Sequence, residues 1–337
     1  MDISKLVEKL ELDGVNRKDI DEIVNYSMIL QEKQLPVIFD LEHFRRLLNM
    51  KKKDFYKIYY SLTTQYKESS IPKNNGKGFR RLTSPSENLK YIQRWILDTV
   101  LAELIIHDKA IGFSIGKSTV LNAKYHINQE FLLKMDLKDF FPSISKKRVY
   151  GFFRSIGYNE NVALFFTDFC THKNCLPQGA PTSPYISNLI CLKLDYRLDS
   201  LCKKRNLTYT RYADDISISG GKKTKYIKKN VQEIIEDEGF FVNHEKTVIV
   251  YKNKRQKITG VVVNDKPSIP KEMYRKIRQD IYYIDKYGLT SHLKKVGLLH
   301  KSNVKQYYFG LANYFKMIDN DKGQKILNAL KKIDWNT

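Results

Sequence analysis

Residues 211–218, Arg-Tyr-Ala-Asp-Asp-Ile-Ser-Ile, place two adjacent carboxylates between short β-prone segments. Apolar and polar residues alternate after them, as in a strand with one buried face, and Asp is disfavoured inside strands but accepted in turns. The stretch therefore predicts a β-hairpin with Asp214 and Asp215 near its tip. Neighbouring carboxylates repel each other unless a hard cation lies between them, and Mg²⁺ takes oxygen ligands. An acidic, solvated turn is the alternative for such a pair taken alone.

A third acid lies in residues 131–142, Phe-Leu-Leu-Lys-Met-Asp-Leu-Lys-Asp-Phe-Phe-Pro. The mostly apolar run predicts a buried strand that carries Asp136, and a buried carboxylate is costly unless it is paired or metal-bound. If this strand lies beside the hairpin, Asp136, Asp214 and Asp215 would hold two cations about 3.5–4 Å apart, as in an in-line phosphoryl displacement. Asp139 is a weaker candidate: it lies past the expected strand end, where a local cap or ion pair is the alternative to a direct catalytic role.

These two segments resemble motifs A and C of reverse transcriptases, because residues 212–215, Tyr-Ala-Asp-Asp, match the Tyr-x-Asp-Asp box of that family. Between them, residues 176–189 begin Leu-Pro-Gln-Gly and continue to Ser183 and Pro184, as in motif B of the bacterial enzymes. Three matched motifs in order are more specific than any one of them. The resemblance implies an α+β fold of the right-hand polymerase type, with helix-rich fingers, an antiparallel-sheet palm and a helical thumb.

The resemblance also implies a binding site for the incoming dNTP. Residues 77–82 resemble the fingers segment that holds the triphosphate, which points to Lys77 and Arg80. A basic turn on a basic protein is the alternative for both. Gln178 and Gly179 of the motif B segment are assigned to the same site.

Two further positions follow from the resemblance. Phe141, five residues after Asp136, takes the place of the aromatic ring that excludes a 2′-hydroxyl and so selects dNTPs. Phe140 and Phe141 are alternatively simple core residues. Residues 239–247 resemble motif D, in which Lys246 takes the place of the general acid that protonates pyrophosphate; a solvated lysine is the alternative.

Two short elements indicate the subtype. Residues 122–126 contain an Asn-Ala-x-x-His element, and residues 258–260, Ile-Thr-Gly, resemble a Val-Thr-Gly element in which Ile keeps the β-branching. Together they resemble retron reverse transcriptases, whereas alone the first would be a helix-surface pair. The resemblance assigns RNA recognition to four residues of these elements: Asn122, His126, Thr259 and Gly260.

The implied function is that of a retron RNA-directed DNA polymerase using two Mg²⁺ ions and dNTPs on a cognate structured non-coding RNA. Synthesis would start at an internal 2′-hydroxyl, give branched RNA–DNA (msDNA) and serve anti-phage defence beside a separate effector protein. The alternatives are another bacterial reverse transcriptase, of group II intron, diversity-generating or abortive-infection type, or a catalytically idle RNA-binding scaffold. We expect no maturase or endonuclease extension, which disfavours the group II intron type. The intact Leu-Pro-Gln-Gly disfavours the diversity-generating type. A scaffold would have no use for a metal-binding acid cluster.

Composition agrees with a nucleic-acid partner. The 337 residues include 59 Lys and Arg against 37 Asp and Glu, a net charge of +22, which suits a protein that follows phosphate backbones. The sequence has no apolar run of about 18 residues and no signal peptide, so we expect a cytoplasmic protein without a membrane partner. The four cysteines lack metal-ligand spacing and are expected to be reduced.

The length predicts several subdomains. We expect an N-terminal helical region at 1–50, fingers at 51–130, a palm with part of the fingers at 131–265 and a helical, RNA-binding thumb at 266–337. In the fingers, Ser84 and Glu87 have the spacing of a capping box, with Pro85 at the first helical position. The thumb segment carries fifteen Lys and Arg against six Asp and Glu.

Overall fold

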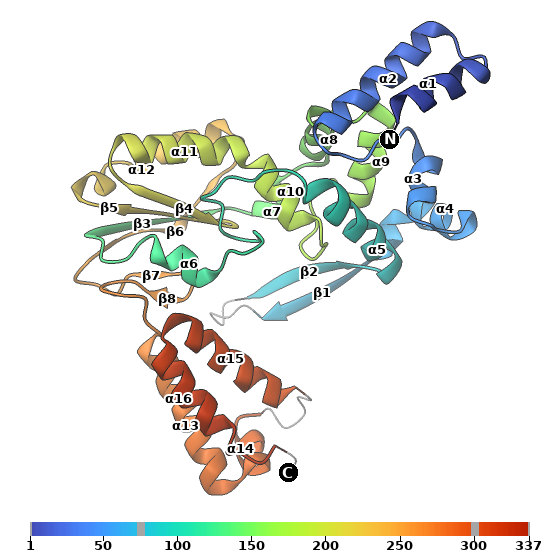
Figure 1. The fold of residues 1–337 in the computed structure, drawn as a ribbon. Coiled ribbons are helices and arrows are strands. Elements are labelled where there is room, and N and C mark those ends of the chain that lie inside the picture. Colours follow the sequence, from blue (N-terminus) through green and yellow to red (C-terminus); the bar gives the residue numbers. More distant parts are fainter. Residues whose placement is uncertain (1, 73–77, 298–302, 336–337) are drawn as a thin grey trace. The chain divides into compact units, whose positions relative to one another are not determined.

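The computed structural model describes residues 2–72, 78–297 and 303–335, and Figure 1 labels its helices and strands. The chain divides into two compact units. The first unit comprises Met1–Ser114, Leu137–Arg197 and Ile234–Val242, and the second comprises Ile115–Asp136, Leu198–Glu233 and Asn243–Thr337. Neither unit is continuous in sequence, because the chain passes repeatedly between them. The division into N-terminal region, fingers, palm and thumb stays a prediction.

The first unit is mostly helical. Its α-helices are α1 (Ile3–Leu12), α2 (Arg17–Glu32), α3 (Leu41–Leu47), α4 (Lys52–Tyr60), α5 (Glu87–Ile96), α7 (Phe140–Ser143), α8 (Lys146–Ser155), α9 (Glu160–Cys170) and α10 (Ser183–Ile190). A 3₁₀ helix, η1 (Leu62–Gln65), follows α4, and a π-helix, η2 (Leu97–Leu101), continues α5. Asn and Asp side chains cap several N-termini, as Asn159 does for α9 by accepting from the amide of Val162. The core is aromatic: the fully buried ring of Phe44 stacks on Phe165 with centroids 5.3 Å apart.

An antiparallel hairpin of β1 (Tyr66–Pro72) and β2 (Phe79–Pro85) also belongs to the first unit. It corrects the predicted capping box. Ser84 and Pro85 end strand β2, where Pro85 pairs with Tyr66, and the side chain of Ser86 caps α5 by accepting from the amide of Leu89. Because residues 84 and 85 pair with β1, the helix cap lies at Ser86, two residues later than predicted.

The second unit contains a four-stranded sheet with the order β4 (Thr208–Tyr212), β5 (Asp215–Gly220), β3 (Phe131–Leu137) and β6 (Val242–Tyr251). Strand β5 is antiparallel to both β4 and β3. All residues of β3 are buried except Lys134, which is half-buried, so the predicted buried strand is confirmed. Helices α11 (Leu192–Lys204) and α12 (Lys228–Asp237) each run from one unit into the other, and the 3₁₀ helix η3 (Lys222–Lys225) follows β5.

Helix α6 (Thr119–Lys124) packs against β4 and against the small antiparallel pair β7 (Lys257–Ile258) and β8 (Val261–Val262). A hydrophobic cluster holds these elements together; its buried members are Val120, Ala123, Leu132, Ile258, Val261 and Val263. The two sequence elements that indicate the retron subtype are therefore neighbours in the fold.

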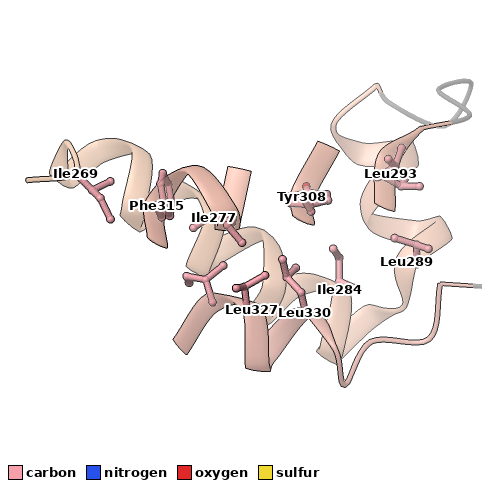
Figure 2. Packing of buried hydrophobic residues seen from close by; sticks show 12 residues of the cluster. Ile269, Ile277, Ile284, Leu289, Leu293, Tyr308, Phe315, Leu327 and Leu330 are labelled. Carbon is pink, nitrogen blue, oxygen red and sulfur yellow. The ribbon is translucent and has the colours of Figure 1, made fainter. Parts of the chain in front are cut away.

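Four helices complete the second unit: α13 (Lys271–Tyr287), α14 (Leu289–Lys295), α15 (Val304–Ile318) and α16 (Asn320–Leu330). Figure 2 shows their shared core, in which Ile277 and Ile284 of α13 face Tyr308 and Phe315 of α15 and the apolar side chains of α16. Helices α15 and α16 approach so closely that a Cβ on Gly323 would lie 2.2 Å from the backbone nitrogen of Lys316. This all-helical segment agrees with the predicted one.

Across the described parts of the chain, we find no helix with the length and hydropathy needed to cross a bilayer.

Candidate active site

The hairpin predicted at residues 211–218 is present. Tyr212 pairs with Asp215, which leaves Ala213 and Asp214 as a two-residue connection between β4 and β5. Ala213 has a φ of 57°, in the left-handed region that tight hairpin turns use. The fully buried guanidinium of Arg211 donates from Nη1 to the carbonyl of Ala213 at 3.1 Å, so the turn is held from within the fold.

The three predicted carboxylates lie together in the second unit. Asp136 is directly opposite Asp215 in the β3–β5 pairing, and Asp214 occupies the adjacent turn. Burial raises the pKa of Asp214 to about 6, with further contributions from the charges of Asp215 and Asp136. Burial also raises the pKa of Asp215, and the charge of Asp136 acts in the same direction. The prediction that Asp136 lies beside the hairpin is confirmed.

Two residues of strand β6 contact Asp136. The ammonium of Lys246 lies 2.9 Å from Oδ1 and 3.0 Å from Oδ2 of this carboxylate, and Nδ2 of Asn243 donates to Oδ1 at 3.2 Å. The hydrogen bond to Asp136 is the main cause that raises the pKa of Lys246, and the nearby aspartates add to it. Lys246 therefore carries a proton at neutral pH within reach of the acid cluster, while its side chain is more than half exposed.

The donor set suits a hard divalent cation, because carboxylate oxygens are the ligands that such ions prefer. Burial is the main cause of the raised pKa values of Asp214 and Asp215, so their charged forms lose hydration that a bound cation would replace. In the residues that the structure describes, no three His, Cys, Asp or Glu side chains already stand in the geometry of a metal site.

The residues assigned to the sugar of a nucleotide belong to the first unit. Phe140 is 4 % exposed and packs on Phe240, with ring centroids 5.9 Å apart. Phe141 is only half-buried, and its ring centroid lies 6.2 Å from that of Phe113. Phe140 is therefore a core residue, and Phe141 is the ring of the two with surface left to offer a ligand.

The motif B loop is attached to strand β2. The carbonyl of Gln178 accepts from the amide of Thr83 at 2.8 Å. Gly179 has a φ of 140°, and a Cβ there would lie 2.9 Å from the carbonyl oxygen of Thr83, so only glycine fits. Lys77 lies outside the described residues; the backbone of Arg80 pairs with Ile71 in the hairpin, and its side chain also lies outside what the structure describes.

The residues assigned to RNA recognition lie inside the second unit. Asn122 is 1 % exposed and His126 is 0 % exposed. The hydroxyl of Thr259 donates to the carbonyl of Thr119 in α6 at 3.0 Å, and Gly260 forms the turn between β7 and β8. Asn122 and His126 therefore offer no exposed surface for direct contact with RNA. A role of the four residues in RNA recognition stays a prediction.

Two site residues were not predicted from the sequence, Arg211 and Asn243. The burial of Arg211 could have been predicted from strand periodicity. Arg211 lies two residues after the buried Tyr209 and pairs with Ile216, so it shares the apolar face of the hairpin. Asn243 lies three residues before Lys246 in the motif D segment, but nothing in that spacing indicates that both would reach Asp136.

The raised pKa of Asp214 predicts a pH-dependent stability. Since this pKa rises from 3.8 to about 6 on folding, the folded state binds the proton more tightly. The resulting stabilisation is fully present below pH 3.8 and is lost as pH rises through about 6. The free energy of unfolding of the wild type should therefore decline between pH 3.8 and about 6 by an amount that depends on Asp214. In the presence of a chelator, we expect this decline to be smaller by about 1–3 kcal/mol in Asp214→Asn, because asparagine does not titrate.

Chemical denaturation at a series of pH values measures this difference. Asp265→Asn, at an exposed acid outside the cluster, is the matched control and should leave the profile unchanged. Identical pH profiles for the wild type and Asp214→Asn would contradict the prediction.

Comparisons with known proteins agree with this geometry. Residues 71–263 match the family model described as reverse transcriptase (RNA-dependent DNA polymerase). The retron Ec86 reverse transcriptase of Escherichia coli is 33 % identical over 309 residues, which cover 90 % of this chain and 92 % of that protein. The retron Mx162 reverse transcriptase of Myxococcus xanthus is 35 % identical, and the match covers 80 % of this chain but only 61 % of that longer protein.

Among solved structures, telomerase from Candida albicans in complex with a TWJ fragment of telomeric RNA matches with a TM-score of 0.45 and 13 % identity. The match covers 83 % of this chain and 65 % of that one.

Proposed function

Because this chain belongs to the reverse transcriptase family, and within it to the retron-type enzymes, we propose that it copies a cognate structured RNA into DNA at the acid cluster of the second unit. Family membership makes it an RNA-directed DNA polymerase, and enzymes of this family use divalent metal ions. The convergence of Asp136, Asp214 and Asp215 in one sheet supports the proposed location of the chemistry.

We assign two Mg²⁺ ions to these three carboxylates. When bound, the ions would supply Lewis-acid stabilisation of the attacking and leaving oxygens in phosphoryl transfer. The protein holds the ligands on adjacent strands, and Arg211 fixes the turn that presents Asp214. Lys246, with its raised pKa, is the proposed proton donor to pyrophosphate, because it keeps its proton at neutral pH beside Asp136.

The incoming substrate is proposed to be a dNTP. Phe141 is the proposed ring against the sugar, and the glycine at position 179 allows the motif B loop to lie close to strand β2. Gln178 belongs to the same loop, and its backbone carbonyl accepts a hydrogen bond from the amide of Thr83. Lys77 and Arg80 remain the proposed contacts to the triphosphate.

The RNA is proposed to be a non-coding RNA that also supplies the primer as an internal 2′-hydroxyl, which gives branched RNA–DNA. The C-terminal helices α13–α16, rich in Lys and Arg, are the proposed grip on the duplex, since A-form helices are bound through phosphates and 2′-hydroxyls rather than through base sequence. A separate effector protein and a role in anti-phage defence complete the proposal, which the relationship to retron enzymes supports.

Purification of the protein with its bound nucleic acid tests the retron assignment. We expect one structured RNA, joined to DNA through a 2′–5′ bond, to dominate the copurified material. Sequencing identifies the RNA, and a debranching enzyme should release the DNA with a free 5′ end. Recovery of unbranched DNA alone from cells that contain the non-coding locus would contradict the retron assignment but not the polymerase activity.

A further inference from the structure

A buried imidazole joins the two strands that carry the acidic turn. The Nδ1 atom of His126 lies 2.7 Å from Oγ of Ser219 in β5, and its Nε2 atom lies 2.7 Å from Oγ1 of Thr210 in β4. All three side chains are fully buried. The ring therefore spans the hairpin and satisfies one hydroxyl on each strand in an environment where unpaired polar groups are costly.

This bridge depends on the observed register of the hairpin. Thr210 pairs with Ser217, and Ser219 pairs with Thr208, so the two hydroxyls bonded by His126 are diagonal neighbours on the same face. A slip of one residue between β4 and β5 would move Thr210 to the opposite face and break the bridge. The same register makes Tyr212 the partner of Asp215 and leaves Asp214 in the turn.

The bridge and the carboxylates also share a face of the sheet. Along β5, Ser219, Ser217 and Asp215 occupy alternate positions, which point to one side of a strand. Asp136 lies on this side as well, because it is the direct partner of Asp215. His126 thus contacts the face that carries the acids, four residues from Asp215 along the strand.

Hydrogen bonds also fix the backbone around His126, directly after α6. The amide of His126 donates to the carbonyl of Ala123 in the last turn of α6, and Asn128 donates to the carbonyl of Val263. Ala123 packs with Ile258 in the buried cluster, and the bond from Thr259 to Thr119 ties α6 to the β7–β8 turn. His126 is therefore fixed by both elements that indicate the retron subtype.

We infer that His126 is a positioning residue, which acts through Thr210 and Ser219 to hold the register of the β4–β5 hairpin and so the placement of Asp214 and Asp215. The inference rests on the proposed metal-binding role of these carboxylates. It also replaces direct RNA contact by His126 with an indirect role in the polymerase reaction on any template.

The test uses the full chain and a DNA primer annealed to a generic RNA template. His126→Leu removes both bonds, whereas His126→Gln retains a donor and an acceptor. For His126→Leu we expect kcat to fall by roughly 10–100-fold, as for a misplacement of catalytic groups by up to about 1 Å. We expect Mn²⁺ binding without nucleic acid, measured by electron paramagnetic resonance, to weaken in the same variant and to recover in His126→Gln.

Two further variants keep the test informative if His126→Leu folds poorly. Thr210→Val and Ser219→Ala each remove one end of the bridge while His126 stays in place, and each variant on its own should weaken Mn²⁺ binding. Thr167→Val is the matched control, since it removes a buried hydroxyl that bonds the carbonyl of Ala163 within α9. It should lower the melting temperature without changing Mn²⁺ affinity.

Unchanged Mn²⁺ affinity in His126→Leu, with a loss of activity that merely follows the melting temperature, would overturn the inference. A loss confined to the cognate RNA would overturn it as well and would restore direct recognition. If the metal site itself is wrongly assigned, Asp214→Asn will bind Mn²⁺ normally, which separates that failure from this one.

Discussion

Asp214→Asn is expected to abolish primer extension while leaving RNA binding largely intact. The substitution keeps the shape of the side chain but removes a charge that a metal ligand needs, and Asp214 lies in the turn beside Asp136 and Asp215. Loss of metal positioning should lower kcat by at least about three orders of magnitude, or about 4 kcal/mol of transition-state stabilisation. Single-turnover extension of an annealed primer, with a filter-binding measurement of RNA affinity, gives both quantities.

Asp139→Asn is the matched control for this variant. Asp139 is exposed, precedes α7 without a side-chain cap bond, and has a φ of 47°, a conformation that Asn also adopts readily. It should extend primers at close to the wild-type rate. Near-normal extension by Asp214→Asn would refute the metal assignment, and a loss in Asp139→Asn would bring that residue into the site.

Phe141→Ala is expected to admit ribonucleotides. The half-buried ring of Phe141 is proposed to occupy the space that a 2′-hydroxyl would need, so its removal should reduce the preference for dNTP over rNTP by roughly 10–200-fold, the range for a small steric difference in a pocket. The ratio of kcat/KM for the two substrates measures the effect.

Phe140→Leu controls for a general packing defect. Since Phe140 is buried against Phe240, its replacement should lower stability and leave the substrate ratio unchanged. A changed ratio in Phe140→Leu, with none in Phe141→Ala, would identify Phe140 as the selective ring.

The sequence alone determined the elements whose pattern is local. Adjacent aspartates after a β-prone segment predicted the hairpin, and the apolar run around Asp136 predicted the buried strand beside it; the pairing of Asp136 with Asp215 confirms both. The helices expected within 266–337 are present as well, and their buried residues, such as Ile277 and Ile284 of α13, recur at helical spacing. In each case the spacing of apolar residues along the chain indicates which face of the strand or helix is buried.

Only the tertiary structure decided the partners of polar residues. Ser84 carries a sound capping signal, yet strand pairing with β1 moves the cap to Ser86. His126 has the spacing of a surface residue, yet both of its ring nitrogens bond hydroxyls that are more than 80 residues away in sequence. A polar side chain is stable in the core wherever the fold supplies its hydrogen bonds, and those partners come from distant segments that no local pattern specifies.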